Sequence, residues 1–105
     1  MIEKQAVVQK LEALAHETRL DVYQMLMQAG PKGAAAGWLA EQLAVAPSAL
    51  SFHLTRLKQA GLIHSRRVGQ SILYAADFEQ MQHLVGYLTE SCCRQSETPC
   101  GPVCQ

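Results

Sequence analysis

The 105-residue sequence lacks three features, and each absence excludes a class of protein. No apolar run approaches the roughly 20 residues of a transmembrane helix, which excludes a membrane protein of that kind. No cysteine occurs before Cys92, and four cysteines in the last fourteen residues are not the framework of a disulfide-stabilised secreted domain. Net charge is also absent, because 9 Lys and Arg balance 9 Asp and Glu, and at face value this argues against a nucleic-acid partner.

The N-terminal segment, MIEKQAVVQKLEALAHETRL, has none of the marks of an export signal. Its charges begin at Glu3, and it contains neither an apolar stretch of about 7–15 residues nor a small-residue cleavage site. We therefore expect a cytoplasmic protein with no membrane partner, whose cysteines remain thiols in a reducing compartment.

Acidic residues are missing from the middle of the chain. Between Glu41 and Asp77 there is no Asp or Glu, and this stretch carries four cations, Arg56, Lys58, Arg66 and Arg67. Residues 1–41 have a net charge of −1 and residues 77–105 a net charge of −3, which cancel the +4 between them. The neutral total therefore hides a basic module in the middle third.

The spacing of apolar residues predicts several helices. Residues 7–14 and 20–27 have the period of amphipathic helices, separated at His16-Glu17-Thr18 and ended by Gly30-Pro31. The small residues of GPKGAAAG that begin at Gly30 predict a loop. A last helix is expected to begin near Asp77, an acid suited to a helix N-terminus. Its apolar stripe consists of Phe78, Met81, Leu84, Val85 and Leu88.

Two short helices with a tight turn are predicted where the basic module begins. Trp38, Leu39 and Leu43 form one short apolar face, and Pro47 fits the first position of the next helix, where its missing N–H is not needed. This second helix ends at Gly61. Its expected buried stripe consists of Ala49, Leu50, Leu54 and Leu57. Such a pair of helices is a helix-turn-helix.

A β-hairpin is predicted directly after these helices. Strand-forming residues at 63–67 and 71–75 flank Val68-Gly69-Gln70. The expected fold is therefore mainly α with a β-hairpin wing, a winged helix-turn-helix that dimerises because so small a core is marginal. We expect residues 1–91 to form the DNA-binding and dimerisation domain and residues 92–105 a cysteine-rich tail.

The exposed face of the second helix matches the needs of a DNA-recognition helix. It carries short hydroxyl groups near its start, which suit base edges, and cations toward its end, which suit phosphates. The hairpin adds cations beside it. The predicted DNA contacts are Ser48, Ser51, Phe52, His53, Thr55, Arg56, Lys58, Arg66, Arg67 and Gln70. An ordinary solvated helix face is the alternative, but the coincidence of the acid-free block with the helix-turn-helix favours DNA.

Two residues of this region have other readings. His53 stands between the exposed Phe52 and the buried Leu54, so a partly buried structural role and a DNA contact both remain open. Arg19 is expected to anchor the first two helices through Glu17 or Asp21 rather than to touch DNA.

Three segments in combination resemble the ArsR/SmtB family of small, dimeric, winged-helix, metal-responsive repressors. They are LEALAHETRLDVYQML (11–26), SALSFHLTRLKQAGLI (48–63) and RRVGQSILYAADF (66–78). The resemblance implies that the first and last helices form a homodimer interface and that Ser48, Ser51 and their neighbours enter the major groove. It also implies that the free protein binds double-stranded operator DNA with an inverted repeat and leaves it when an inducer binds.

The cysteine tail suggests the inducer. Thiolates are soft ligands that select thiophilic ions. Cys92 and Cys93 end the last helix, and the break at Pro99-Cys100-Gly101-Pro102 lets the tail bring a third sulfur to them. Three thiolates match the trigonal-pyramidal demand of As(III) or Sb(III). The CC-x6-C-x3-C spacing lacks the two CxxC pairs of a structural zinc site, although zinc and an unstructured tail with incidental thiols remain alternatives.

Family patterns sharpen this prediction. Some relatives place a cysteine pair at the start of the helix that precedes the recognition helix, where this chain has Ala35-Ala36-Gly37 instead. The zinc pattern that other relatives carry on the last helix is broken. The sequence resembles members whose arsenic site is a C-terminal Cys-Cys plus a downstream cysteine. That resemblance assigns the ligand role to Cys92, Cys93 and Cys100, with Cys104 as a spare or a substitute.

The predicted function is an arsenite-responsive transcriptional repressor without an organic cofactor. The alternatives are a sensor of another thiophilic or zinc-like ion with the same DNA-binding mechanism, and a dimeric interaction protein with structural zinc. An enzyme such as an arsenate reductase is not expected, because no cysteine is followed at the sixth position by Arg to form an anion-binding loop.

Overall fold

The computed structural model describes the backbone of residues 3–95 and the side chains of residues 3–90. It is mainly helical with a small antiparallel sheet, and a hairpin follows a helix-turn-helix, as predicted. The elements in chain order are α1 (Lys4–Leu14), α2 (Glu17–Ala29), the short 3-10 helix η1 (Gly30–Lys32), β1 (Ala34–Ala35), α3 (Ala36–Leu43), α4 (Pro47–Gln59), β2 (Ile63–Val68), β3 (Ser71–Ala76) and α5 (Phe78–Gln95).

The core lies where α2, α3 and α4 meet the base of the hairpin. Its largest fully buried side chains are Val22, Leu26, Leu39, Leu50, Leu54, Leu57 and Leu62. The predicted stripe of α4 is correct except for Ala49, which is exposed. The buried face of α4 is defined by Leu50, Leu54 and Leu57. Ala49 lies about 100° around the helix from Leu50 and therefore falls outside this face.

Local signals at the helix ends agree with the sequence. The interruption at His16 is real, because its Nδ1 accepts a hydrogen bond from the Thr18 N–H (3.2 Å) and caps the start of α2. The last helix begins after Asp77, whose Oδ1 accepts from the Gln80 N–H (3.1 Å). In the described part of the chain, no helix combines the length and apolarity needed to cross a bilayer.

The segment predicted as a loop contains a strand. Ala34 and Ala35 pair antiparallel with Tyr74 and Leu73, which gives the strand order β1-β3-β2. Gly33 makes this approach possible, because it has a positive φ of 74° and a Cβ there would lie 2.2 Å from the Tyr74 carbonyl oxygen. Two alanines carry almost no strand signal of their own, so this pairing depends on the tertiary fold.

The hairpin turn is shorter than predicted. Val68 still pairs with Ser71, so the turn consists of Gly69 and Gln70 alone. Gly69 has a φ of 64°, and a positive φ at the first of two turn residues is the pattern of a type II′ turn, whose twist matches that of the strands.

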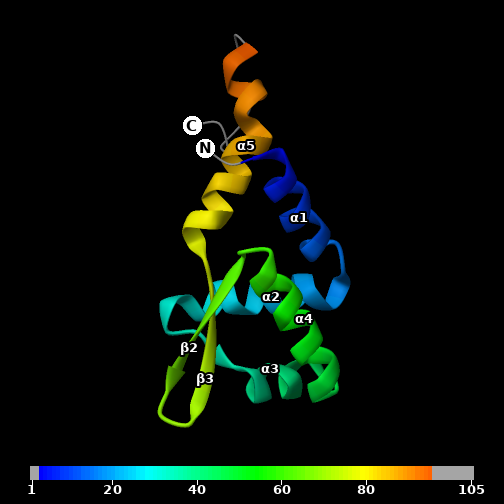
Figure 1. Cartoon of the computed structure of the whole chain (residues 1–105), viewed down its shortest axis with the longest axis vertical. Helices are drawn as coiled ribbons and strands as arrows, with labels where there is room; N and C mark the ends of the chain where they lie inside the picture. Colours follow the sequence, from blue (N-terminus) through cyan, green and yellow to red (C-terminus); the bar gives the residue numbers. More distant parts are fainter. Residues whose placement is uncertain (1–2, 96–105) are drawn as a thin grey trace.

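The molecule is elongated (Figure 1), with the elements predicted to bind DNA gathered at one end. The hairpin turn, α3 and the start of α4 lie at the lower end of the view, whereas α1 and most of α5 lie at the upper end. α1 also contacts α5. The two predicted surfaces, one for DNA and one for a second subunit, are therefore at opposite ends of the molecule.

Candidate nucleic-acid interface

The outward face of α4 is built as the sequence predicts. Leu50, Leu54 and Leu57 point into the core, and Pro47 occupies the first turn. Opposite the buried stripe, the exposed side chains are Ser48, Ser51, Phe52, Thr55, Arg56 and Lys58. The Thr55 hydroxyl donates to the Ser51 carbonyl one turn earlier (2.9 Å), so it can still accept a hydrogen bond from a base.

Two of the four predicted cations brace the wing against the helices. The Lys58 Nζ donates to the Ser65 Oγ (2.8 Å) and so links α4 to β2. The Arg66 guanidinium donates to the carbonyl oxygens of Pro31 (3.0 Å) and Lys32 (3.1 Å) in η1. The sequence assigned both side chains to phosphates and gave no signal for these internal partners.

The next residue along β2 is differently placed. The Arg67 side chain is exposed and makes no hydrogen bond or ion pair within the described residues. Successive side chains of a strand point to opposite faces, so Arg67 points away from η1, which Arg66 holds. Gln70 is exposed in the hairpin turn close by. Arg67 is therefore the cation of the wing best placed to meet a phosphate.

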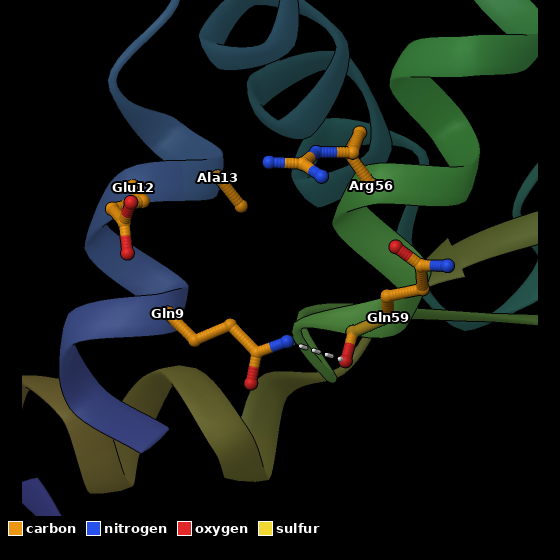
Figure 2. A pocket seen from close by; sticks show the side chains of 5 residues that line it. All are labelled: Gln9, Glu12, Ala13, Arg56 and Gln59. Carbon is orange, nitrogen blue, oxygen red and sulfur yellow. Dashed lines mark hydrogen bonds between the residues drawn. The ribbon is translucent and has the colours of Figure 1, made fainter. Parts of the chain in front are cut away.

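Arg56 lies on the side of α4 that faces α1. Figure 2 shows its guanidinium extending toward Ala13, beside a small pocket of about 70 Å³ that Gln9, Glu12 and Gln59 also line. The Gln9 amide nitrogen donates to the Gln59 carbonyl across this gap (3.4 Å). Arg56 is consequently at the flank of the recognition helix rather than at its centre.

His53 takes part in a cluster that ties α4 to the start of α2. Its ring is half-buried and lies 4.6 Å from the ring of His16, centroid to centroid. The Arg19 Nη1 lies 3.3 Å from the His53 Nδ1, so the neutral ring can accept from it. Burial lowers the pKa of His53, and the nearby His16 and Arg19 lower it further. Of the two readings left open, these internal partners favour the structural one.

Arg19 anchors the helices, but not through the expected carboxylates. Its Nε donates to the Ala13 carbonyl (2.7 Å), one of the carbonyls that the end of α1 leaves unpaired. The expectation of Glu17 or Asp21 as its partner is therefore corrected to a backbone oxygen and His53. Nothing in the local spacing could reveal this cluster, because His16 and His53 are far apart in the sequence.

The predicted ion ligands fall at the edge of the described chain or beyond it. Cys92 and Cys93 belong to the last turn of α5, but their side chains are outside the described residues. Cys100 and Cys104 lie outside them altogether. Within the described residues no three His, Cys, Asp or Glu side chains are grouped to hold a metal ion.

Comparison with known proteins identifies similar chains. A family model described as a helix-turn-helix domain matches residues 14–66, from the end of α1 into β2. The HTH-type transcriptional regulator YgaV of Escherichia coli (strain K12) is 36% identical over 83 residues, which cover 79% of this chain and 82% of YgaV. The alignment therefore covers most of both proteins.

Two solved structures extend the likeness to three dimensions. An ArsR-like transcriptional regulator from Rhodococcus sp. RHA1 superposes with a TM-score of 0.74 and 29% identity, covering 82% of this chain and 78% of that one. HlyU from Vibrio cholerae, named a transcriptional activator, superposes with a TM-score of 0.67 and 29% identity, covering 89% of this chain and 100% of that one. All three of these proteins are named as regulators of transcription.

Proposed function

Because the chain belongs to the ArsR/SmtB-type family of helix-turn-helix transcriptional regulators, we propose that it is a cytoplasmic, arsenite-responsive repressor. Like its relatives, it is a DNA-binding regulator of transcription and not an enzyme. The proposal adds that it binds an inverted-repeat operator as a homodimer and is released when As(III) or Sb(III) binds its C-terminal cysteines.

The DNA-binding part is carried by one observation, the hydroxyl-rich outward face of α4 beside the wing. Ser48 and Ser51 are exposed near the start of that helix. The start of α4 lies at the same end of the molecule as the hairpin turn (Figure 1). A recognition helix meets base edges with its N-terminal residues, while a wing supports it on the backbone. Arg67 supplies the charge for that support.

The homodimer is proposed from apolar side chains that a single chain leaves in water. Val8 and Leu11 on α1 are 46% and 41% exposed, and Val85 and Leu88 on α5 are 38% and 55% exposed. Burying such side chains is favourable, and a second copy of the same surface would cover them. Pairing at this end leaves both α4 helices available for half-sites about one helical turn apart, roughly 34 Å.

The inducer is proposed from the cysteines alone, because YgaV and HlyU are named for regulation and not for an ion. Cys92 and Cys93 lie in the last turn of α5, which carries part of the proposed dimer surface. A thiophilic ion that joins them to Cys100 would act on the geometry of the pair of subunits. A coupling of about 1–3 kcal/mol would weaken operator binding by roughly 5–150-fold, and operator DNA would weaken ion binding by the same factor. A sensor of another thiophilic or zinc-like ion, with the same DNA mechanism, is the alternative.

The test is a fluorescence-anisotropy titration of the full chain on a palindromic duplex, with and without arsenite. We expect arsenite to weaken binding, and we expect the response to be lost in Cys92→Ser, Cys93→Ser and Cys100→Ser. Cys104→Ser is the matched control and should respond as the unaltered protein does; loss of the response there, with a retained response in Cys100→Ser, would make Cys104 the third ligand.

Three results would contradict parts of the proposal. Binding that arsenite leaves unchanged removes the inducer. A retained response in all three serine variants removes the assigned site but not the inducer. One zinc ion bound per tail in native mass spectrometry would instead favour the structural-zinc alternative.

A further inference from the structure

An exposed aromatic ring stands at the centre of the outward face of α4. Phe52 is 59% exposed, although it sits on a helix whose other large apolar side chains are buried. It comes two residues after Leu50 and two before Leu54, which places it on the opposite side of the helix from the core. A single exposed apolar residue is common on protein surfaces, so exposure alone decides nothing.

The neighbours of Phe52 leave its ring standing above them. Its exposed neighbours on α4 are Ser48, Ala49 and Ser51 toward the N-terminus and Thr55 and Arg56 toward the C-terminus. The first four side chains are shorter than a phenyl ring, and the guanidinium of Arg56 extends toward Ala13, on the side of α4 that faces α1 (Figure 2). The ring of Phe52 is therefore the large apolar group of this face of α4, with hydroxyl groups on both sides of it.

The ring is also held in place. It packs edge-on against the ring of His53, with centroids 5.8 Å apart and planes at 63°. The guanidinium carbon of Arg56 lies 6.0 Å from its centroid, at the limit of a cation–π contact. His53 is itself fixed by Arg19 and His16. An apolar group fixed in this way loses little conformational freedom when it binds.

DNA offers one apolar partner to such a ring. The major groove displays hydrogen-bond donors and acceptors on every base pair, and the C5-methyl group of thymine is its apolar feature. A second subunit does not fit as the occupant, because the α1–α5 surface lies at the other end of the molecule (Figure 1). The isolated ring among hydroxyl groups suits one methyl among hydrogen-bonding base edges.

We propose that Phe52 determines sequence specificity by packing against the C5-methyl group of one thymine in each half-site. The inference rests on the proposed DNA-binding function and adds which base the central side chain selects. Ser48, Ser51 and Thr55 form hydrogen bonds with neighbouring base edges, while Phe52 favours thymine because its methyl group replaces water against the ring.

The first experiment compares binding sites selected from randomised duplexes by the unaltered protein and by Phe52→Ala. The unaltered protein should select thymine at one position of each half-site. Phe52→Ala should lose that preference and retain the others, whereas Phe52→Leu, which keeps an apolar contact, should retain it in weaker form. Val68→Ala removes another exposed apolar residue, in the wing, and should leave every preference unchanged.

The second experiment removes only the methyl group, by replacing that thymine with deoxyuridine. Affinity of the unaltered protein should fall about fourfold per half-site, the loss expected when one methyl leaves an apolar contact. Phe52→Ala should bind the two duplexes equally. Its thermal unfolding should match that of the unaltered protein, because the ring is exposed.

The outcomes separate this inference from the proposed function. Equal binding of thymine and deoxyuridine by the unaltered protein, or an unchanged preference in Phe52→Ala, overturns the role of Phe52 while DNA binding stands. A kink in the bound duplex that disappears in Phe52→Ala without any loss of thymine preference also overturns it, in favour of insertion between bases. Failure of the unaltered protein to select any sequence overturns both.

Discussion

The two ends of the molecule expose apolar side chains in different ways. At the end formed by α1 and α5, Val8, Leu11, Val85 and Leu88 are exposed together on two neighbouring helices. At the other end, Phe52 is the large apolar side chain exposed on α4, and the side chains of His53 and Arg56 contact its ring, while Trp38, Val68 and Ile72 are exposed on other elements, α3 and the hairpin. A broad apolar surface suits another broad surface, whereas one fixed ring suits one small apolar group. The comparison teaches that the arrangement of exposed apolar residues, rather than their number, indicates the partner.

The largest effect is expected from breaking the broad surface. Leu88→Glu places a charge where the second copy is proposed to pack, so the dimer should dissociate. Operator affinity should then fall by about 10²–10⁴-fold, because the second half-site is no longer bound by a linked module. Sedimentation velocity and anisotropy on the palindromic duplex measure the two effects.

The matched control for that variant lies at the other end. Val68→Glu introduces the same charge at a similarly exposed apolar residue of the wing and should leave the protein dimeric. A Leu88→Glu protein that sediments as a dimer would move the subunit interface away from α5.

A smaller effect should separate the two arginines of the wing. Arg67→Ala is expected to lower the slope of log affinity against log salt by about 0.9 per subunit, the share of one lost phosphate contact. Arg66→Ala should change the slope less and lower the unfolding temperature more, because its guanidinium holds Pro31 and Lys32. If both variants lowered the slope equally, relative to the unaltered protein, Arg66 would be shown to leave its internal partners and contact a phosphate when DNA binds.

The smallest effect concerns the cluster behind Phe52. Burial, His16 and Arg19 lower the pKa of His53, so the unfolded chain takes up its proton more readily than the folded one. The stability that neutral His53 contributes is therefore complete above about pH 6.5, the ordinary value, and declines as the pH falls through it. Urea unfolding between pH 8 and pH 5 should show this decline.

His53→Gln isolates that contribution, since an amide oxygen can accept from Arg19 without titrating. The variant should lose less stability than the unaltered protein over the same pH range. An identical pH dependence in both proteins would mean that the cluster does not couple protonation to folding.

The spacing of apolar residues predicted most of the fold, because the leucines of α4 and many apolar residues of the other helices lie on the faces that the core buries. It missed β1, since the pairing of Ala34 and Ala35 with β3 depends on the approach that Gly33 allows. For the site, the exposed face of α4 could be predicted, because the buried leucines determine which side faces water. DNA contact and ion binding remain predictions.

What the sequence could not supply is the reach of long side chains. The charge of Arg66 and Lys58 is visible in the sequence, but their partners are not. Arg66 donates to Pro31, 35 residues earlier, and Lys58 donates to Ser65 in the next element, β2. The same holds for Arg19, which turns from the expected carboxylates to a carbonyl of α1. Composition locates a basic module. Only the folded structure shows which of its cations bind other groups of the protein and which remain available for DNA.

The hold of Arg66 on η1 has a consequence for protein engineering. The hydrogen bonds of Arg66 to η1 and the pairing of β1 with β3 together fix the hairpin to residues 30–35. A chimaera that exchanges wings between related regulators must therefore carry this short stretch along with the hairpin. Transplanting residues 63–76 alone would deliver the right sequence on a wing that points elsewhere.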